Sequence, residues 1–239
     1  WDLKQFYKVL IGGYGSGKTY IGALRSIYLS YLNQPHAGMY VSPSHGLSQR
    51  TIVVTLKDIL NRSGLNYTYN QMKGEFHIHN WDGRIWLGSG DKPDSLKGSN
   101  LAWAGIDEPF IQKKEVFDQM IARVRHPEAK QSEVFLTGTP EQLNWGYQLS
   151  NRDDIDIGIV YGSTLDNSHL PEEYKQNLLS AYSDDEIKAY VHGQFINLTQ
   201  GRVYKDFDRT KHIAKRTDLN HLPVVICQDY NVDYASALA

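Results

Sequence analysis

The sequence predicts an α/β fold with a mostly parallel central sheet flanked by helices. Short apolar runs alternate along the chain with amphipathic stretches at helical spacing, a pattern typical of βαβ units. A glycine-rich turn also joins the first apolar run to the first amphipathic stretch. Hydrophobic residues make up 41% of the chain and charged residues 22%, close to ordinary globular values, which excludes a fully disordered protein.

Length and charge narrow the possibilities further. The 239 residues allow one large domain, or one domain and a fragment of a second. The net charge of −2 excludes a histone-like polycation but leaves room for a local basic patch that binds DNA. Cys227 is the single cysteine, so no internal disulfide can form and a cytosolic location is expected. The longest apolar runs, such as 101–106 and 222–227, are too short to span a bilayer, so no membrane partner is expected.

The elements of the core are predicted in order from local patterns. Residues 6–11 form an apolar run that predicts a strand, and Asp82-Gly83 between two alternating runs, 76–81 and 84–87, predicts a hairpin. A helix over 18–31 is predicted by an apolar stripe at positions i, i+3, i+7 and i+10, made of Ile21, Leu24, Tyr28 and Tyr31. Similar signals predict strands at 39–42, 101–106, 134–136 and 155–161, and helices at 47–60 and 116–124.

The pattern changes after Asn167. Two helices are predicted at 171–182 and 184–191, the second between a plausible N-cap and a stop at Gly193. Residues 201–218 are polar and charged and predict a linker, and 224–227 predict a new strand. The chain begins at Trp1 rather than Met and ends at Ala239 within an apolar stretch, so we expect both ends to continue in a longer protein.

The strongest functional signal is the run Gly-Gly-Tyr-Gly-Ser-Gly-Lys-Thr at 12–19. It fits the P-loop (Walker A) pattern G-x-x-x-x-G-K-[ST] and lies between a predicted strand and a predicted helix. Glycines let backbone N–H groups surround phosphates, and the helix N-terminus favours negative charge. We expect Lys18 to reach the β- and γ-phosphates of ATP and the Thr19 hydroxyl to ligate Mg²⁺. The predicted ATP-binding residues are Gly13, Tyr14, Gly15, Ser16, Gly17, Lys18, Thr19 and Tyr20.

The second signal is an apolar run at 101–106 that ends in Asp107-Glu108, the Walker B arrangement. Asp107 is expected to hold Mg²⁺ through its water shell, and Glu108 to orient and polarise the attacking water. An Asp-Glu pair after a strand is often a solvated loop, but its distance from the P-loop favours the catalytic interpretation. The adjacent Glu108 favours hydrolysis over phosphoryl transfer to a small molecule.

The third signal is Phe-Leu-Thr-Gly-Thr-Pro at 135–140. A strand that ends in small hydroxyl residues beside the phosphate-binding strand can sense the γ-phosphate. The alternative is a strand that leads into an ordinary polar turn.

Taken together, these three motifs resemble the large terminase subunit of tailed bacteriophages. The stretch Met-Tyr-Val-Ser-Pro at 39–43 is similar to the family's motif after the second strand, and the residues around 193–195 and 201–207 are similar to its passage between domains. The resemblance covers nearly the whole chain. It implies a RecA-like P-loop ATPase with a small helical lid subdomain, with boundaries at 1–165 for the core and 166–200 for the lid.

Beyond the lid, the resemblance implies an interdomain linker at 201–222 and the truncated start of an RNase H-like nuclease domain at 223–239. Asp229 would be the first metal-binding carboxylate of that nuclease, the alternative being an ordinary strand-end aspartate. A two-metal site needs several carboxylates, and the others would lie beyond Ala239, so endonuclease activity is expected in the full-length protein and not in this fragment.

Two departures from the family pattern concern its arginines. The family commonly has Arg inside the P-loop, where this chain has Tyr14, and often in a Ser-x-Arg-Gly stretch, where this chain has Lys97. An arginine finger neutralises charge on the transferring phosphoryl group, whereas Lys is a point charge without the planar fork. Lys97 is the positional candidate for this catalytic cation, and Arg123 and Arg125 are other possible fingers.

The resemblance implies an ATP-hydrolysing motor that uses Mg²⁺ to move double-stranded DNA into a procapsid. In that role Thr137, Gly138 and Thr139 would couple hydrolysis to movement. The implied partners are DNA, the portal protein, the small terminase subunit and further copies of the chain in a ring on the procapsid, in the host cytoplasm. Two alternatives stay open: the first RecA-like domain of a helicase or other nucleic-acid-dependent ATPase, and a non-catalytic P-loop scaffold, against which the intact motif residues argue.

Overall fold

The computed structural model describes residues 3–140, 143–196, 227–230 and 235–238. The chain divides into two compact units, Trp1–Thr199 and Gln200–Ala239. The first unit contains both the predicted ATPase core and most of the predicted lid, and the boundaries proposed within it stay predictions. The predicted linker at 201–218 lies outside the described residues.

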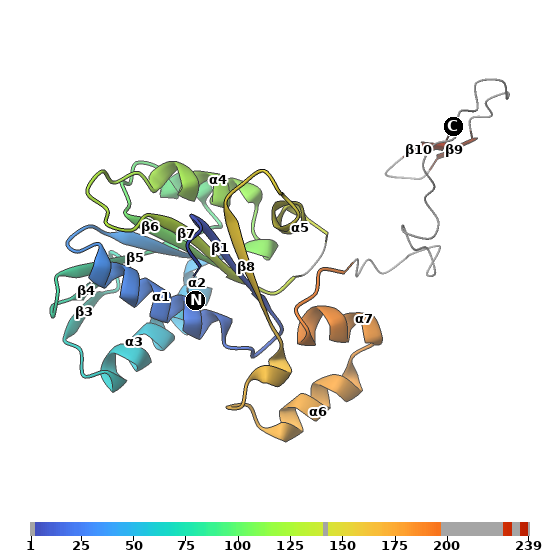
Figure 1. Ribbon diagram of the computed structural model, residues 1–239, viewed down its shortest axis with the longest axis horizontal. Helices are drawn as coiled ribbons and strands as arrows, with labels where there is room; N and C mark the ends of the chain where they lie inside the picture. Colours follow the sequence, from blue (N-terminus) through green and yellow to red (C-terminus); the bar gives the residue numbers. More distant parts are fainter. Residues whose placement is uncertain (1–2, 141–142, 197–226, 231–234, 239) are drawn as a thin grey trace. The chain divides into compact units, whose positions relative to one another are not determined.

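One mixed sheet forms the frame of the first unit (Figure 1). Its strand order is β3-β4-β5-β2-β6-β7-β1-β8. The six strands from β5 to β8 run parallel, whereas β3 and β4 extend one edge in antiparallel fashion. The bounds are β1 Tyr7–Gly12, β2 Gly38–Ser42, β3 Tyr67–Asn70, β4 Glu75–Ile78, β5 Gly83–Ser89, β6 Trp103–Asp107, β7 Glu133–Gly138 and β8 Ile157–Gly162. The predicted mostly parallel sheet is therefore confirmed.

The hairpin predicted at Asp82-Gly83 is also present. Asp82 has a φ of 56°, which places it in the left-handed region that such tight turns need, and β4 pairs with β5 on either side of it. The strand β3, by contrast, was not predicted. It is a short, half-exposed edge strand with only a weak apolar pattern.

Helices cover both faces of this sheet (Figure 1). Their bounds are α1 Lys18–Leu32, α2 His45–Arg50, α3 Ile52–Arg62, α4 Lys114–Arg123, α5 Trp145–Ser150, α6 Glu172–Ala181 and α7 Asp184–Glu186. Short 3₁₀ turns lie at η1 Pro93–Leu96, η2 Pro109–Ile111 and η3 Thr164–Asp166, and a π-helical turn η4 spans Ile187–Val191. The single helix predicted at 47–60 is divided at Thr51, whose φ of −116° and ψ of −76° depart from helical values.

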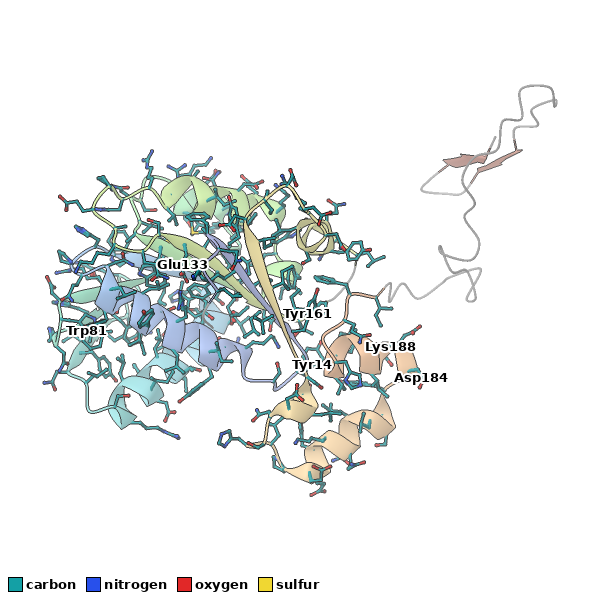
Figure 2. All side chains as sticks on the ribbon, viewed as in Figure 1. Tyr14, Trp81, Glu133, Tyr161, Asp184 and Lys188 are labelled. Carbon is teal, nitrogen blue, oxygen red and sulfur yellow. The ribbon has the colours of Figure 1, made fainter. Side chains whose placement is uncertain are left out.

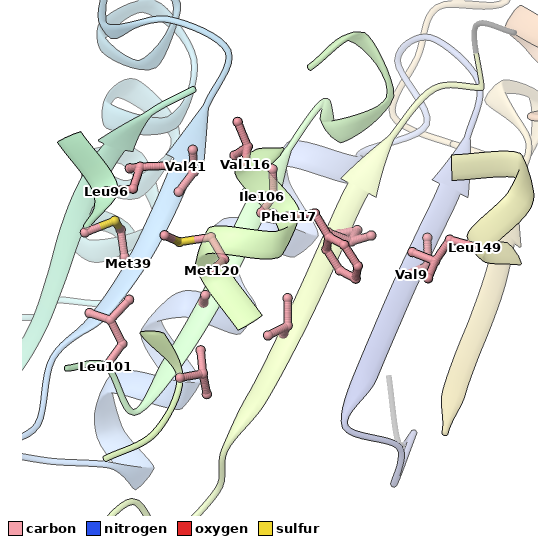
Figure 3. Close-up of a cluster of buried hydrophobic side chains, with 14 of the residues drawn as sticks. Val9, Met39, Val41, Leu96, Leu101, Ile106, Val116, Phe117, Met120 and Leu149 are labelled. Carbon is pink, nitrogen blue, oxygen red and sulfur yellow. The ribbon is translucent and has the colours of Figure 1, made fainter. Parts of the chain in front are cut away.

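Two hydrophobic clusters hold the layers together. One joins α1 and α3 to one face of the sheet around Tyr40, Trp103 and Phe135. The other joins α4 and α5 to the opposite face around Ile106 and Leu136 (Figure 3). Because side chains alternate along a strand, the central strands β2, β6 and β7 contribute to both clusters and are buried on both faces.

The apolar stripe that predicts α1 is not its buried face. Ile21, Leu24, Tyr28 and Tyr31 are exposed, with fractional exposures of 36 to 51%. The face against the sheet consists largely of small side chains, because α1 lies close to the strands: a Cβ at Gly22 would collide with the Tyr40 hydroxyl. The helix was predicted correctly from its period, but period alone does not say which stripe is buried.

A buried cluster of charged side chains joins β1, α1 and the start of β7. Glu133, at the start of β7, accepts hydrogen bonds from Lys8 Nζ at 2.6 Å and from Arg25 Nε and Nη2 at 2.7 and 2.5 Å, and its side chain is fully buried (Figure 2). Burial raises the pKa of Glu133, but the two cations outweigh burial and hold that pKa below its ordinary value.

The second unit contains two described strands. These are β9, Cys227–Tyr230, and β10, Ala235–Leu238, which pair in antiparallel fashion with Asp229 opposite Ser236. The predicted strand at 224–227 thus overlaps β9 at Cys227, and its earlier residues lie outside the described part of the chain.

Among the described residues, no helix is both long enough and apolar enough to cross a membrane.

Candidate active site at the carboxyl edge of the sheet

Three loops meet where the parallel strands end. β1 leads into the P-loop, β6 ends at Asp107, and β7, which lies between these two strands, ends at Gly138. The register pairs Ile11 with Gly138 and Asp107 with Thr137. The three motifs of the sequence therefore lie side by side at the edge where α/β folds bind their ligands.

The P-loop has the backbone that its glycines allow. Gly15 and Gly17 have φ values of 72° and 91°, in the left-handed region, and Gly17 is the N-cap of α1. The Ser16 hydroxyl and the Lys18 ammonium both donate to the Gly13 carbonyl, at 2.7 and 2.8 Å. The loop is thus folded around its own lysine.

Lys18 and Glu108 face each other across the site. Lys18 Nζ lies 3.9 Å from Glu108 Oε1, and the lysine is 6% exposed. Burial lowers the pKa of Lys18, while the carboxylates of Glu108 and Asp107 act in the opposite direction. The lysine charge is thus partly desolvated and lies between the Gly13 carbonyl and the Glu108 carboxylate.

Asp107 is held by three hydroxyl groups. Thr137 Oγ1 donates to its carboxylate at 2.9 Å, Thr19 Oγ1 at 3.2 Å and the Tyr40 hydroxyl at 3.3 Å. Burial raises the pKa of Asp107, although these hydrogen bonds act against that rise. The carboxylate and the Thr19 hydroxyl are hard oxygen donors of the kind that Mg²⁺ binds, so the residues fit this ion.

Tyr40 is a site residue that the sequence analysis missed. Its ring is fully buried, and its hydroxyl lies 3.2 Å from Thr137 Oγ1 as well as near Asp107. Burial raises the pKa of Tyr40 well above its ordinary value, so the phenol stays neutral and can donate. Only its position in the motif at 39–43, at the end of a strand next to β6, could have indicated this role.

Glu108 is fixed in an unusual backbone conformation. Its φ of 46° and ψ of 54° are left-handed, which is uncommon outside glycine and asparagine and carries a conformational cost. Its backbone N–H donates to the Thr137 carbonyl at 2.7 Å, and its Oε2 accepts from the Thr139 N–H at 3.0 Å. The carboxylate is therefore oriented by the third motif, beside the lysine of the first.

The third motif contacts both carboxylates of the second motif. Thr137 bonds Asp107 through its hydroxyl, and Thr139 bonds Glu108 through its backbone. Gly138 lies against the segment after Glu108, because a Cβ there would come 2.7 Å from Pro109 Cδ. The hydroxyl of Thr139 is buried and has no hydrogen-bond partner within the described structure.

The segment after β8 contacts the outer side of the P-loop, which the sequence did not indicate. The Tyr14 N–H donates to the Tyr190 carbonyl, Thr164 Oγ1 to the Tyr14 carbonyl and Asn167 Nδ2 to the Gly15 carbonyl, all at 2.7 Å. The ring of Tyr14, which is labelled in Figure 2, stacks on that of Tyr190 with centroids 4.8 Å apart. A side chain at Gly13 would collide with the Val191 carbonyl.

The three candidate cations lie elsewhere in the single chain. Lys97 follows η1, is exposed and pairs with Asp94. Arg123 and Arg125 flank Val124 near the start of β6, because the Leu101 N–H donates to the Arg123 carbonyl and the Arg125 N–H to the Leu101 carbonyl. That is the edge of the sheet opposite to the P-loop. Their role as the catalytic cation stays a prediction.

Two further predicted residues can be placed only in part. Tyr20 lies in the first turn of α1 with 44% of its side chain exposed. Asp229 lies in β9 of the second unit, and its predicted role as a metal ligand stays untested.

Comparisons with known proteins agree on one family. A family model described as "Terminase large subunit, T4likevirus-type, N-terminal" matches residues 9–211. The PBSX phage terminase large subunit of Bacillus subtilis (strain 168) is 28% identical over 233 residues, which cover 87% of this chain and 53% of that protein.

Solved structures share the fold. The large terminase of a thermophilic bacteriophage, in complex with ADP, superposes with a TM-score of 0.72 at 17% identity and covers 98% of this chain and 60% of that chain. The large terminase ATPase domain of Thermus phage P74-26 gives a TM-score of 0.59 at 14% identity, covering 82% and 90%. The chain thus spans a little over half the length of the PBSX terminase and of the ADP-bound one. Since the family model matches most of its residues, the chain belongs to the large terminase subunit family, in its N-terminal part.

Proposed function

We propose that the chain is the ATP-hydrolysing motor part of a phage DNA-packaging terminase. The observation that carries this proposal is the meeting of Lys18, Thr19, Asp107 and Glu108 at one edge of the sheet, in a chain of this family. That the related terminase of a thermophilic bacteriophage was solved with ADP supports nucleotide binding at the same fold. The family membership favours this function over the helicase and scaffold alternatives.

The residues divide the work of hydrolysis between them. The P-loop N–H groups and Lys18 bind the phosphates, and Thr19 and Asp107 would hold Mg²⁺. When bound, the ion offsets phosphate charge and polarises the phosphoryl oxygens. Glu108 orients a water molecule and accepts its proton, held in place by the Thr139 N–H at 3.0 Å. Thr137 and Thr139 join this chemistry to β7, which supports a coupling role for the third motif.

Hydrolysis is tested with Glu108→Gln. The amide keeps the size of the side chain and its contact with Thr139 but cannot accept a proton. We expect ATP affinity close to wild type and a loss of turnover of about 10²- to 10⁴-fold. Thr19→Ala is the companion variant, and it should weaken Mg²⁺-dependent binding as well. Turnover that survives Glu108→Gln would refute the assignment of the water-orienting residue.

The partners belong to the whole protein. We propose that the full-length chain binds double-stranded DNA, the portal protein and the small terminase subunit, and acts as a ring of copies on the procapsid in the host cytoplasm. The packaging step is tested by incubating the full-length protein with DNA, ATP and procapsids of the same phage, and measuring how much of the DNA becomes resistant to nuclease. If ATP turnover is normal but the DNA is not protected, the packaging proposal fails and the hydrolysis proposal stands.

A cation supplied by a neighbouring copy has its own test. Chains carrying Lys97→Ala keep an intact P-loop and Glu108, whereas Glu108→Gln chains keep Lys97. If Lys97 acts in the site of a neighbour, mixing the two inactive chains restores turnover, and the rate per chain rises with protein concentration. Arg123→Ala and Arg125→Ala are compared in the same way. Failure of every mixture to recover activity would argue against a cation donated between copies.

A further inference from the structure

A second group of ligand-type side chains lies away from the P-loop. His36, His126 and Glu128 each offer one ligand atom, and these atoms lie within 4.8 Å of one another. His36 Nε2 is 3.2 Å from Glu128 Oε2, and the two imidazole rings have their centroids 3.8 Å apart. Glu128 is exposed and the histidines are half-buried, so the group is open to solvent.

The loops that carry these side chains are fixed to each other by hydrogen bonds of a buried asparagine. Asn33 is fully buried; its Nδ2 donates to the Gln131 carbonyl and its Oδ1 accepts from the Gln131 N–H, both at 3.0 Å. The His36 N–H donates to the Asn33 carbonyl at 2.8 Å. These hydrogen bonds therefore join the turn after α1, which carries His36, to the loop before β7, which carries His126 and Glu128.

His126 is anchored from a third segment. Its N–H donates to the Leu101 carbonyl at 3.1 Å, and its own carbonyl accepts from the Ala129 N–H at 3.2 Å in a tight turn. That turn places Glu128 two residues after His126. Ligands held on anchored backbones lose little freedom when they bind an ion, which is the condition for a preorganised metal site.

We propose that His36, His126 and Glu128 form a binding site for a divalent transition-metal ion, with zinc as the probe. Two imidazoles and one carboxylate are a ligand set that zinc takes in proteins, with water in the fourth position. Imidazole ligands disfavour Mg²⁺ and Ca²⁺, which prefer oxygen donors alone. Ligand atoms of a tetrahedral zinc site lie about 3.3 Å apart, given metal–ligand bonds of about 2.0 Å, so the pair His36–Glu128 already has this spacing.

The site would hold the turn after α1 and the loop before β7 together and would not take part in hydrolysis. His126 and Leu101 lie at the start of β6, whereas Asp107 ends that strand in the candidate active site. A bound ion would cross-link the end of α1 to the start of β7, two segments far apart in sequence. It should therefore raise stability without being required for turnover.

Zinc titration of the untagged chain, free of nucleotide and Mg²⁺, tests the site. We expect one zinc equivalent and a rise in melting temperature of about 5 °C or more at a hundredfold excess over Kd. His126→Ala should weaken binding more than about tenfold, since loss of even an outer partner costs that much. His169→Ala, which removes an exposed imidazole outside the cluster, is the matched control and should bind zinc as wild type does. Equal affinity in wild type and His126→Ala would overturn the proposal.

X-ray absorption at the zinc edge of the wild-type complex gives a readout that needs no variant. A first shell with two imidazole nitrogens is the expected result, and an all-oxygen shell would refute the site. If His36 and Glu128 form only an ion pair, no stoichiometric zinc binds at any pH, and the proposal fails.

Discussion

Replacing Thr137 with Val removes the shortest hydrogen bond to the buried carboxylate of Asp107, 2.9 Å long, with little change in shape. Hydrogen bonds to charged groups contribute about 1.5–3 kcal/mol, and each 1.36 kcal/mol is a factor of ten in rate. We therefore expect kcat/KM for MgATP to fall about 10- to 150-fold. Tyr40 also donates to this carboxylate, at a longer 3.3 Å, and its remaining bond favours the lower part of that range.

The pH dependence of the same variant gives a second test of the hydrogen bond between Thr137 and Asp107. The Thr137 hydrogen bond lowers the pKa of Asp107, so its loss raises that pKa further. Because Asp107 must be ionised to hold Mg²⁺, the acid limb of the pH–rate profile should move to higher pH. Steady-state ATPase assays across pH measure both effects. Thr137→Ser keeps the hydroxyl and is the control. Equal kcat/KM for the Val and Ser variants, or an unmoved acid limb, would refute the reasoning.

Three further substitutions test other parts of the structure. Thr139→Val removes a buried hydroxyl without a partner in the described structure, so the free energy of unfolding in urea should not fall, whereas ATP turnover should; a less stable variant would contradict this. Tyr14→Ala and Tyr190→Ala, combined in a double-mutant cycle of unfolding free energies, should show a coupling of about 0.5–1.5 kcal/mol from their stacked rings; additive effects would mean that the stack is not formed in solution. Glu133→Gln leaves two cations with an uncharged partner and should cost about 3–5 kcal/mol of stability. Since the pKa of Glu133 is depressed in the folded chain, its contribution is present above the ordinary pKa and is lost as pH falls through the folded value; urea midpoints that change equally with pH in wild type and variant would argue against it.

The parts of the site that sequence could predict are those that local pattern dictates. The P-loop needs glycine at positive φ and lysine at a fixed offset, so the sequence of residues 12–19 is enough to predict the backbone of the loop. Asp107 and Glu108 were predicted from the end of an apolar strand. The alternation of strands and helices likewise predicted the parallel sheet, because the βαβ pattern permits few other arrangements.

The parts that sequence could not predict depend on contacts between distant segments. Tyr40 belongs to the site because β2 lies next to β6, and the stacking of Tyr190 on Tyr14 requires the segment after β8 to return to the P-loop. The exposure of the apolar stripe of α1 could likewise not be predicted from periodicity, because it follows from the close packing of the small residues of α1 on the sheet. The cluster at His36 and His126 joins two loops with no shared motif.

The place of β1 in the sheet determines the order in which the molecule can assemble. β1 is the first strand of this unit to be synthesised, yet the partners of Tyr7 are Val134 on β7 and Ile157 on β8. Closing such long loops is entropically costly, and chains dominated by distant pairings fold slowly. During translation the apolar strand β1 therefore stays unpaired until β7 and β8 have left the ribosome. The contact of the P-loop with Tyr190 forms later still. Of the three motifs in this unit, the P-loop is synthesised first and gains its contacts last, so it is complete only when nearly the whole unit has been made.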